Sequence, residues 1–268
     1  MSRKHHKHQD RRQASRSGGS PGEAPVWLYG LHPVSAALAN PHRQCLRLVA
    51  TNETAADAER LARARPAAPP GVEITDRREI DRLLGPGSVH QGLAMQVLPL
   101  EEPDLDETVS GQKIVVVLDQ VVDPHNVGAI LRSAASFGAA AVIVQDRHSP
   151  QATGVLAKAA SGALEWVPLV RVGNLARGLD RLKELGFWVV GLDGEARDML
   201  GEKPLPSPVA LVLGAEGSGL RRLSRESCDL LVAIPSMREG LSLNVSNAAA
   251  VALHEARKQL PLPSTTST

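Results

Sequence analysis

Three short segments of this 268-residue chain place polar or small residues directly after a buried apolar strand. The first segment, 118–133, contains Asn126 and Arg132. They are six residues, nearly two helical turns, apart, so we expect their side chains to point to similar sides of one helix. An arginine among Ile, Leu and Ala side chains usually has an anionic partner. The alternative is that Asn126 caps the helix and Arg132 is an exposed helix charge.

The second segment is a glycine-rich turn after an apolar strand. It runs from Leu213 to Leu220 and carries Glu216 in its middle. Glycines in such a turn leave backbone groups free to meet a ligand. No Gly-Lys-Ser/Thr follows, and the glycine spacing differs from the dinucleotide fingerprint, so neither nucleotide motif is present. Glu216 is either a turn carboxylate or a group that holds a substrate or the arginine.

The third segment follows Ile234-Pro235 and enters an alanine-rich helix. Between 242 and 247 it carries four small polar side chains, namely Ser242, Asn244, Ser246 and Asn247. Helix capping and a polar loop explain only one or two of them. The small residues of the helix allow close approach to a ligand or to a second subunit. Because the carboxyl ends of parallel strands share one edge of a sheet, the second and third segments predict one shared pocket.

The elements around these segments alternate between strands and helices from Lys113 onward, which predicts a mostly parallel sheet. The apolar runs predict strands at Ile114–Leu118, Ala141–Val144, Phe187–Leu192, Pro208–Leu213 and Leu230–Ile234, and Trp166–Val170 is a further apolar stretch. The periodic stretches predict helices at Asn126–Phe137, Gly154–Ala160, Leu175–Leu185 after an Asn174 cap, and Val245–Arg257.

Residues 26–100 predict a separate, small α/β domain, and 113–258 the larger one. In the small domain we expect helices at Pro33–Ala39, Ala55–Arg65 and, after an Asp76 cap, up to Leu84, and strands at Leu46–Ala50, Val72–Ile74 and Leu93–Val97. Residues 101–112 are acidic and lack periodicity, which predicts a linker. Residues 1–25 are basic and poor in apolar side chains, and 259–268 are polar, so both predict flexible tails.

Composition fits an aliphatic core and a local anionic partner. Hydrophobic residues make up 43% of the chain but aromatic residues only 2%. The net charge is +1, yet residues 1–100 carry 14 Lys and Arg against 9 Asp and Glu. That bias fits contact with RNA, with a solvated surface as the alternative. The arginines that we single out as candidate RNA contacts are Arg43, Arg47, Arg77 and Arg78.

Other classes of protein find little support in the sequence. Cys45 and Cys228 lie far apart and without zinc-ligand spacing, which is typical of reduced thiols. His5, His6 and His8 could bind a metal, but a solvated basic tail explains them better, so we expect no metal. No apolar run reaches the length of a membrane span and no signal peptide is evident, so we expect a cytoplasmic protein without a membrane partner.

Taken together, the three segments resemble the motifs of the SpoU (TrmH-type, SPOUT) RNA ribose 2′-O-methyltransferases. The first family motif is matched by Asn126 through Arg132, the second by 213–217, and the third by Ile234-Pro235 with 242–246. Residues 29–33 and 90–92 resemble the ends of the family's substrate-binding domain. The resemblance covers 27–257 and is greatest for the subgroup that modifies a guanosine in 23S rRNA.

The resemblance implies an α/β-knot (trefoil-knotted) domain, a ribosomal-protein-like RNA-binding domain, a homodimer, and S-adenosylmethionine as methyl donor. The positions that match cofactor-contacting residues are Gly214, Ile234 and Leu243, with Leu213, Gly217 and Ser246 beside them. The positions that match polar groups around the transferred methyl are Asn126, Arg132, Glu216, Ser242 and Asn244. We expect Arg132 to stabilise the developing alkoxide and a nearby phosphate, with Glu216 and Asn126 orienting it.

Two departures from the family pattern leave the target nucleotide open. Asn247 stands where many relatives have a small apolar residue, and Met237-Arg238-Glu239 stands where a more neutral loop is common. We expect the substrate to be 23S rRNA, free or in a pre-ribosomal particle, with a tRNA-directed enzyme as the alternative. A catalytically silent RNA-binding ribosome-assembly protein is the alternative outside enzymes, disfavoured by the presence of Asn126, Arg132, Glu216 and Asn244 together. A nucleotide-binding oxidoreductase or an NTPase is disfavoured, because the sequence contains neither of the nucleotide-binding motifs that these enzymes require.

Overall fold

The computed structural model describes residues 24–65, 71–147, 150, 153–237 and 242–261. The tails predicted at 1–25 and 259–268 lie outside these residues except for 24–25 and 259–261. The three tail histidines, and part of the loop that departs from the family pattern, lie outside them as well.

The N-terminal part of the chain folds as a four-stranded sheet in the order β1-β4-β2-β3. Its strands are β1 (Val26–Tyr29), β2 (Cys45–Ala50), β3 (Val72–Ile74) and β4 (Leu93–Val97), and its helices are α1 (Leu31–Ala39), α2 (Ala55–Arg63) and α3 (Arg77–Leu84). Asp76 caps α3 as predicted, because its carboxylate accepts a hydrogen bond from the Glu79 backbone N–H at 2.8 Å. Strand β1 was not predicted.

The C-terminal part contains a seven-stranded sheet in the order β7-β6-β5-β10-β8-β11-β9. Every pair of neighbouring strands in it is parallel, in agreement with the predicted mostly parallel sheet. The strands are β5 (Ile114–Asp119), β6 (Val142–Gln145), β7 (Leu169–Val172), β8 (Trp188–Leu192), β9 (Asp198–Met199), β10 (Val209–Gly214) and β11 (Leu230–Ala233). The central strands β5 and β10 are almost wholly buried, which explains their continuous Val and Leu runs.

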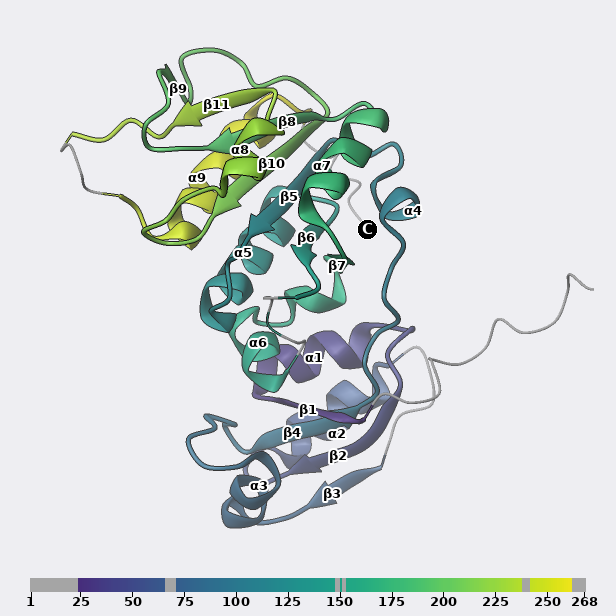
Figure 1. Ribbon diagram of the computed structural model, residues 1–268. Coiled ribbons are helices and arrows are strands. Elements are labelled where there is room, and N and C mark those ends of the chain that lie inside the picture. The colour runs from purple at the N-terminus through teal and green to yellow at the C-terminus, as the bar shows by residue number, and fades with distance from the viewer. Residues whose placement is uncertain (1–23, 66–70, 148–149, 151–152, 238–241, 262–268) are drawn as a thin grey trace, which may run out of the picture.

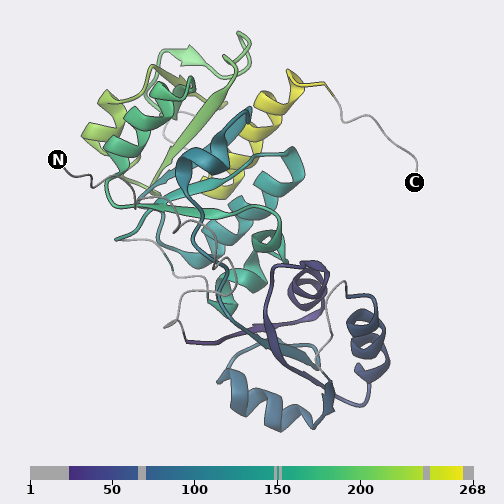
Figure 2. The same ribbon diagram turned by 90° about the vertical axis from the view of Figure 1, so that its right-hand side faces the viewer.

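Helices cover both faces of the large sheet (Figures 1 and 2). They are α4 (Leu105–Val109), α5 (Pro124–Phe137), α6 (Gly154–Ala159), α7 (Leu175–Glu184), α8 (Arg222–Glu226) and α9 (Val245–Lys258), with a 3₁₀ turn η1 at Ala163–Glu165. Buried residues of α5, α6 and α9 share a core with one face of the sheet, and this core continues into the N-terminal part around α1. Buried residues of α7 pack on the other face.

Three differences from the predicted elements have simple causes. The predicted linker contains α4, a single helical turn in which only Leu105 and Val109 pack inward, too short for a periodic pattern. Strand β9 and helix α8 have two and five residues and were not predicted. The apolar run from Trp166 becomes a strand only at Leu169, because Pro168 has no N–H for a sheet ladder.

Helices α5 and α6 approach each other at Gly128. A Cβ atom there would lie 2.4 Å from the Ala159 Cβ and 2.8 Å from the Ala160 nitrogen. We expect Gly128→Ala to lower the free energy of unfolding by about 1–3 kcal/mol through overpacking. Urea denaturation measures this change. The control is Gly173→Ala, where a Cβ meets nothing within 4 Å; equal stability of the two variants would contradict the prediction.

Candidate active site

The candidate site is built where the central strands β5 and β10 end side by side, with Gly214 paired in register with Asp119. Asp123 caps α5 by accepting the His125 backbone N–H at 2.9 Å. Helix α5 therefore begins at Pro124, and Asn126 is its third residue rather than its cap. The Asn126 side chain is thus free to interact outside its own helix.

One carboxylate oxygen joins the three sequence segments. Oε1 of Glu216 accepts a hydrogen bond from Asn126 Nδ2 at 3.0 Å and another from Asn244 Nδ2. Asn244 Nδ2 also lies 3.0 Å from Asn126 Oδ1, to which it donates. The predicted proximity of these three side chains is therefore present in the structure.

Asn244 has a second task, because it is the N-cap of α9. Its Oδ1 accepts the Ser246 backbone N–H at 2.9 Å and the Ser246 hydroxyl at 2.6 Å. Capping thus explains the amide oxygen of Asn244 and the hydroxyl of Ser246, but not the amide nitrogen of Asn244. That nitrogen is directed to Glu216 and Asn126.

The glycine-rich turn after β10 folds back on itself. Gly219 N–H donates to the Ala215 carbonyl at 2.9 Å, and a Cβ at Gly214 would lie 2.1 Å from the Gly219 carbonyl carbon. Gly217, at φ 81°, occupies the left-handed region that favours glycine. Leu213 is 1% exposed, so only its backbone can reach a ligand.

A buried carboxylate at the end of β5 fixes the far end of this turn. Asp119 is fully buried and accepts the backbone N–H of Arg221 at 2.9 Å and its Nε at 2.5 Å. Nη2 of Arg221 donates to Gln145, the last residue of β6, at 2.9 Å. Sequence reasoning assigned no role to these three residues. The available signal was a carboxylate that ends an otherwise apolar strand.

Arg132 forms no hydrogen bond or ion pair with the cluster of Asn126, Glu216 and Asn244. Six residues at 3.6 per turn leave it about 120° around the helix from Asn126, so the expected common side was wrong. Its side chain is exposed, and within the described residues its guanidinium has no hydrogen bond or ion pair. Glu216 and Asn126 contact each other and Asn244, and neither shows the expected direct contact to Arg132.

The remaining predicted site residues differ in exposure. Ile234 is half-buried after β11, whereas Ser242 and Leu243 are exposed just before α9. Leu243 exposes 49% of its surface. A half-buried isoleucine and an exposed leucine offer apolar surface to a ligand.

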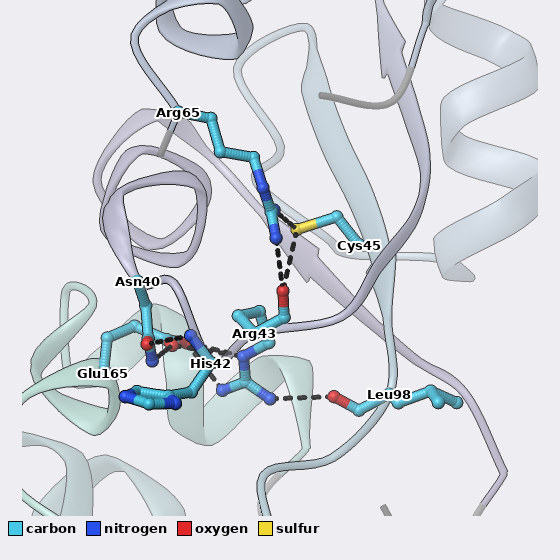
Figure 3. Close-up of polar contacts among 7 residues, drawn as sticks. All are labelled: Asn40, His42, Arg43, Cys45, Arg65, Leu98 and Glu165. Atoms are coloured by element: carbon cyan, nitrogen blue, oxygen red, sulfur yellow. Dashed lines mark hydrogen bonds and ion pairs between the residues drawn. The ribbon is translucent and has the colours of Figure 1, made fainter. Parts of the chain in front are cut away.

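Of the four arginines singled out for RNA, Arg43 was predicted wrongly. Its guanidinium is 5% exposed and pairs with Glu165 at 2.6 Å, in a cluster between the two sheets (Figure 3). Arg47 is half-exposed, pairs with Glu73 and lies 5.9 Å from the Trp27 ring centroid. Arg77 and Arg78 are exposed on α3.

The described residues were also considered as metal ligands and as membrane-spanning helices. Within them, no group of three or more His, Cys, Asp or Glu side chains has the arrangement of a metal site. Likewise, none of the described helices has the length and apolar character needed to cross a membrane.

Comparisons with known proteins place this architecture in a family. The SpoU rRNA methylase family model matches residues 113–254, and the model for RNA 2′-O ribose methyltransferase substrate binding matches 27–103. The 23S rRNA (guanosine-2′-O-)-methyltransferase RlmB of Haemophilus influenzae is 41% identical over 239 residues, 87% of this chain and 97% of its own length. RlmB of Pasteurella multocida is 42% identical over 244 residues, which are 87% and 97% of the two chains.

Solved structures agree with this placement. The SpoU methyltransferase AviRb of Streptomyces viridochromogenes superposes with a TM-score of 0.74 at 25% identity, over 88% of this chain and 89% of its own. Its complex with the cofactor AdoMet gives 0.73 at 26% identity, over 88% and 90%. The chain therefore belongs to the SpoU methyltransferase family.

Proposed function

We propose that this protein transfers a methyl group from S-adenosylmethionine to the ribose 2′-hydroxyl of a guanosine in 23S rRNA. One observation carries the proposal: the Asn126–Glu216–Asn244 cluster lies at the carboxyl edge of the sheet in a chain that aligns over 87% of its length with RlmB of Haemophilus influenzae. A solved structure that concerns the 2-OH methylation of C/U34 on tRNA matches only 55% of this chain. That difference in coverage favours rRNA.

The residues around the glycine-rich turn fit the cofactor by their chemistry. Ile234 and Leu243 offer apolar surface for the adenosine, and the backbone of Gly214 and Gly217 offers hydrogen-bonding groups. Leu213 and Ser246 complete the proposed cofactor-binding set. When bound, S-adenosylmethionine supplies an electrophilic methyl group on a sulfonium, which is already a good leaving group.

The protein's own residues then have to align and activate the ribose hydroxyl. Arginine is protonated at any working pH, so Arg132 stabilises the developing alkoxide and a nearby phosphate rather than removing a proton. The guanidinium of Arg132 has no hydrogen-bond or ion-pair partner among the described residues, so it can bind a phosphate of the RNA. Glu216 and Asn126 act on it through the helix, because their hydrogen bond fixes the first turn of α5. Asn244 and the exposed Ser242 complete the set around the ribose.

Several further features stay predictions for this chain. We propose the division into an RNA-binding domain at 26–100, a linker at 101–112 and a methyltransferase domain at 113–258. A homodimer with the site near the subunit interface and a trefoil knot in the larger domain are proposed from the family resemblance. The cytoplasm, where ribosomal RNA is assembled, is the proposed location.

The first test incubates purified protein with tritiated S-adenosylmethionine and 23S rRNA from cells that lack the enzyme, with tRNA in parallel. We expect one 2′-O-methylated guanosine in the rRNA, mapped by primer extension at low nucleotide concentration. Label in tRNA alone would keep the reaction and overturn the target. Cofactor binding without label in either RNA would point to a pre-ribosomal particle, and the absence of cofactor binding to a silent scaffold.

Replacing Arg132 separates electrostatic stabilisation from a purely structural role. We expect Arg132→Lys to keep part of the single-turnover methylation rate, because the positive charge remains, and Arg132→Ala to lose at least about 100-fold, as for removal of an oxyanion-stabilising donor. Near-wild-type rates for both variants would contradict the proposed role.

Asn244 and Asn174 form a matched pair of helix caps. Asn174 caps α7 by accepting the Arg177 backbone N–H at 3.1 Å and is not part of the cluster. We expect Asn244→Ala and Asn174→Ala each to lower the free energy of unfolding by about 1 kcal/mol. Only Asn244→Ala should also reduce methylation strongly. Equal activity of the two variants, measured below their unfolding temperatures, would show that Asn244 acts as a cap alone.

A further inference from the structure

The two sheets of the protein are joined by a buried cluster around Arg43, which follows α1, and Glu165, in η1 (Figure 3). The side chains of this pair are 5% and 3% exposed. Arg43 Nη2 lies 2.6 Å from Glu165 Oε1, and its Nε lies 3.2 and 3.1 Å from the two carboxylate oxygens. Each residue comes from a different sheet-forming part of the chain, so the pair bridges them.

Residues of the N-terminal part form further hydrogen bonds with this pair. Arg43 Nη1 donates to the Leu98 carbonyl at 2.9 Å, and Asn40 Nδ2 donates to Glu165 Oε2 at 2.8 Å. Arg65 Nη2 in turn holds the Arg43 carbonyl at 2.6 Å. A rotation of the N-terminal part relative to the larger domain would separate the two charges. Because an unpaired buried charge is costly, the pair allows few alternative orientations.

Close backbone approaches at two glycines also join the two parts of the chain. A Cβ at Gly154 would lie 2.3 Å from the Trp27 carbonyl oxygen, and one at Gly162 would lie 2.5 Å from the Ala36 Cβ. Leu28, Val34 and Leu38 of the N-terminal part share one core cluster with Leu156 and Leu164. Figures 1 and 2 both show α1 between the small sheet and the larger domain.

A second polar contact lies beside this packed surface. Lys158 of α6 donates from Nζ to Gln91 Oε1 at 3.0 Å, and burial lowers the pKa of its ammonium. The interface therefore contains apolar side chains from both parts of the chain. Two polar contacts, at Arg43 and at Gln91, join the N-terminal part to the larger domain as well. Domains joined by small polar interfaces usually move relative to each other, whereas a large apolar interface opposes such motion.

We propose that Arg43 and Glu165 are positioning residues for the RNA: they hold the N-terminal domain at one orientation to the methyltransferase site. The distance between the RNA element bound by that domain and the methylated ribose is then set by the protein. The effect on RNA recognition rests on the proposed function. The fixed orientation of the two domains does not depend on it.

The test replaces both charges together, with Arg43→Met and Glu165→Met in one variant, because apolar side chains of similar length can fill a buried ion-pair site without leaving an unpaired charge. Spin labels on cysteines introduced at Arg60 and Lys203, which are 68% and 84% exposed, report the distance between the domains. Burial raises the pKa of Cys45, and that of Cys228 to about 12, so the native thiols label slowly at neutral pH.

We expect a single narrow distance in the parent protein and a broadened one in the double variant, both measured without RNA. The KM for 23S rRNA should rise about tenfold, while kcat at saturating RNA and the Kd for S-adenosylmethionine change less than twofold. A control removes one arginine and one acid from the exposed Arg222–Glu226 pair of α8, as Arg222→Gln with Glu226→Gln, and should leave the distance and the KM unchanged.

The outcomes separate the two proposals. A broad distance in the parent protein, or a narrow distance and an unchanged KM in the folded double variant, would overturn the positioning role. A double variant that unfolds is replaced by Arg43→Lys, which keeps a positive charge beside Glu165 but loses the forked hydrogen bonds, with the same readouts. If the parent protein methylates no RNA, the proposed function fails, while the distances still decide whether the pair fixes the domains.

Discussion

Oε1 of Glu216 accepts hydrogen bonds from the amide nitrogens of two asparagines that lie 90 and 28 residues away in the chain. Those two side chains sit in the first turn of α5 and at the cap of α9. A carboxylate that receives several N–H groups holds each of them more firmly than a neutral acceptor would. The relative placement of the glycine-rich turn and the two helices therefore depends on this one oxygen.

The sheet makes that meeting possible. Because β5 and β10 are parallel and adjacent, their carboxyl ends lie at the same edge, and the segments that follow them start within reach of each other. Asp119 adds a second constraint by binding the backbone and side chain of Arg221, so the turn that carries Glu216 is fixed at both of its ends. Rigid strand ends thus position polar groups that the flexible turn alone could not hold.

Arginines in the N-terminal part show how burial changes the meaning of a charge. Arg43 is almost wholly buried against Glu165, whereas Arg77 and Arg78 face solvent. An acid and a base from different domains that are buried together favour one orientation of those domains. Basic composition alone therefore does not separate an arginine that is exposed on the surface from one that attaches the N-terminal part to the rest of the protein.

The sequence alone determined the parallel sheet, most helix and strand positions, the Asp76 and Asn174 caps, and the family, because these follow from local periodicity, local hydrogen bonding and short motifs. The resemblance of the three motifs also implied that Asn126, Glu216 and Asn244 surround one site, and the order of the strands in the folded sheet brings them together. Only the tertiary structure decided that Asp123 caps α5, that Arg132 stands apart from the cluster, and that Arg43 is buried. Those outcomes depend on which distant side chain, such as Glu165 or Arg221, arrives beside a given residue. No local pattern in the sequence specifies such an encounter.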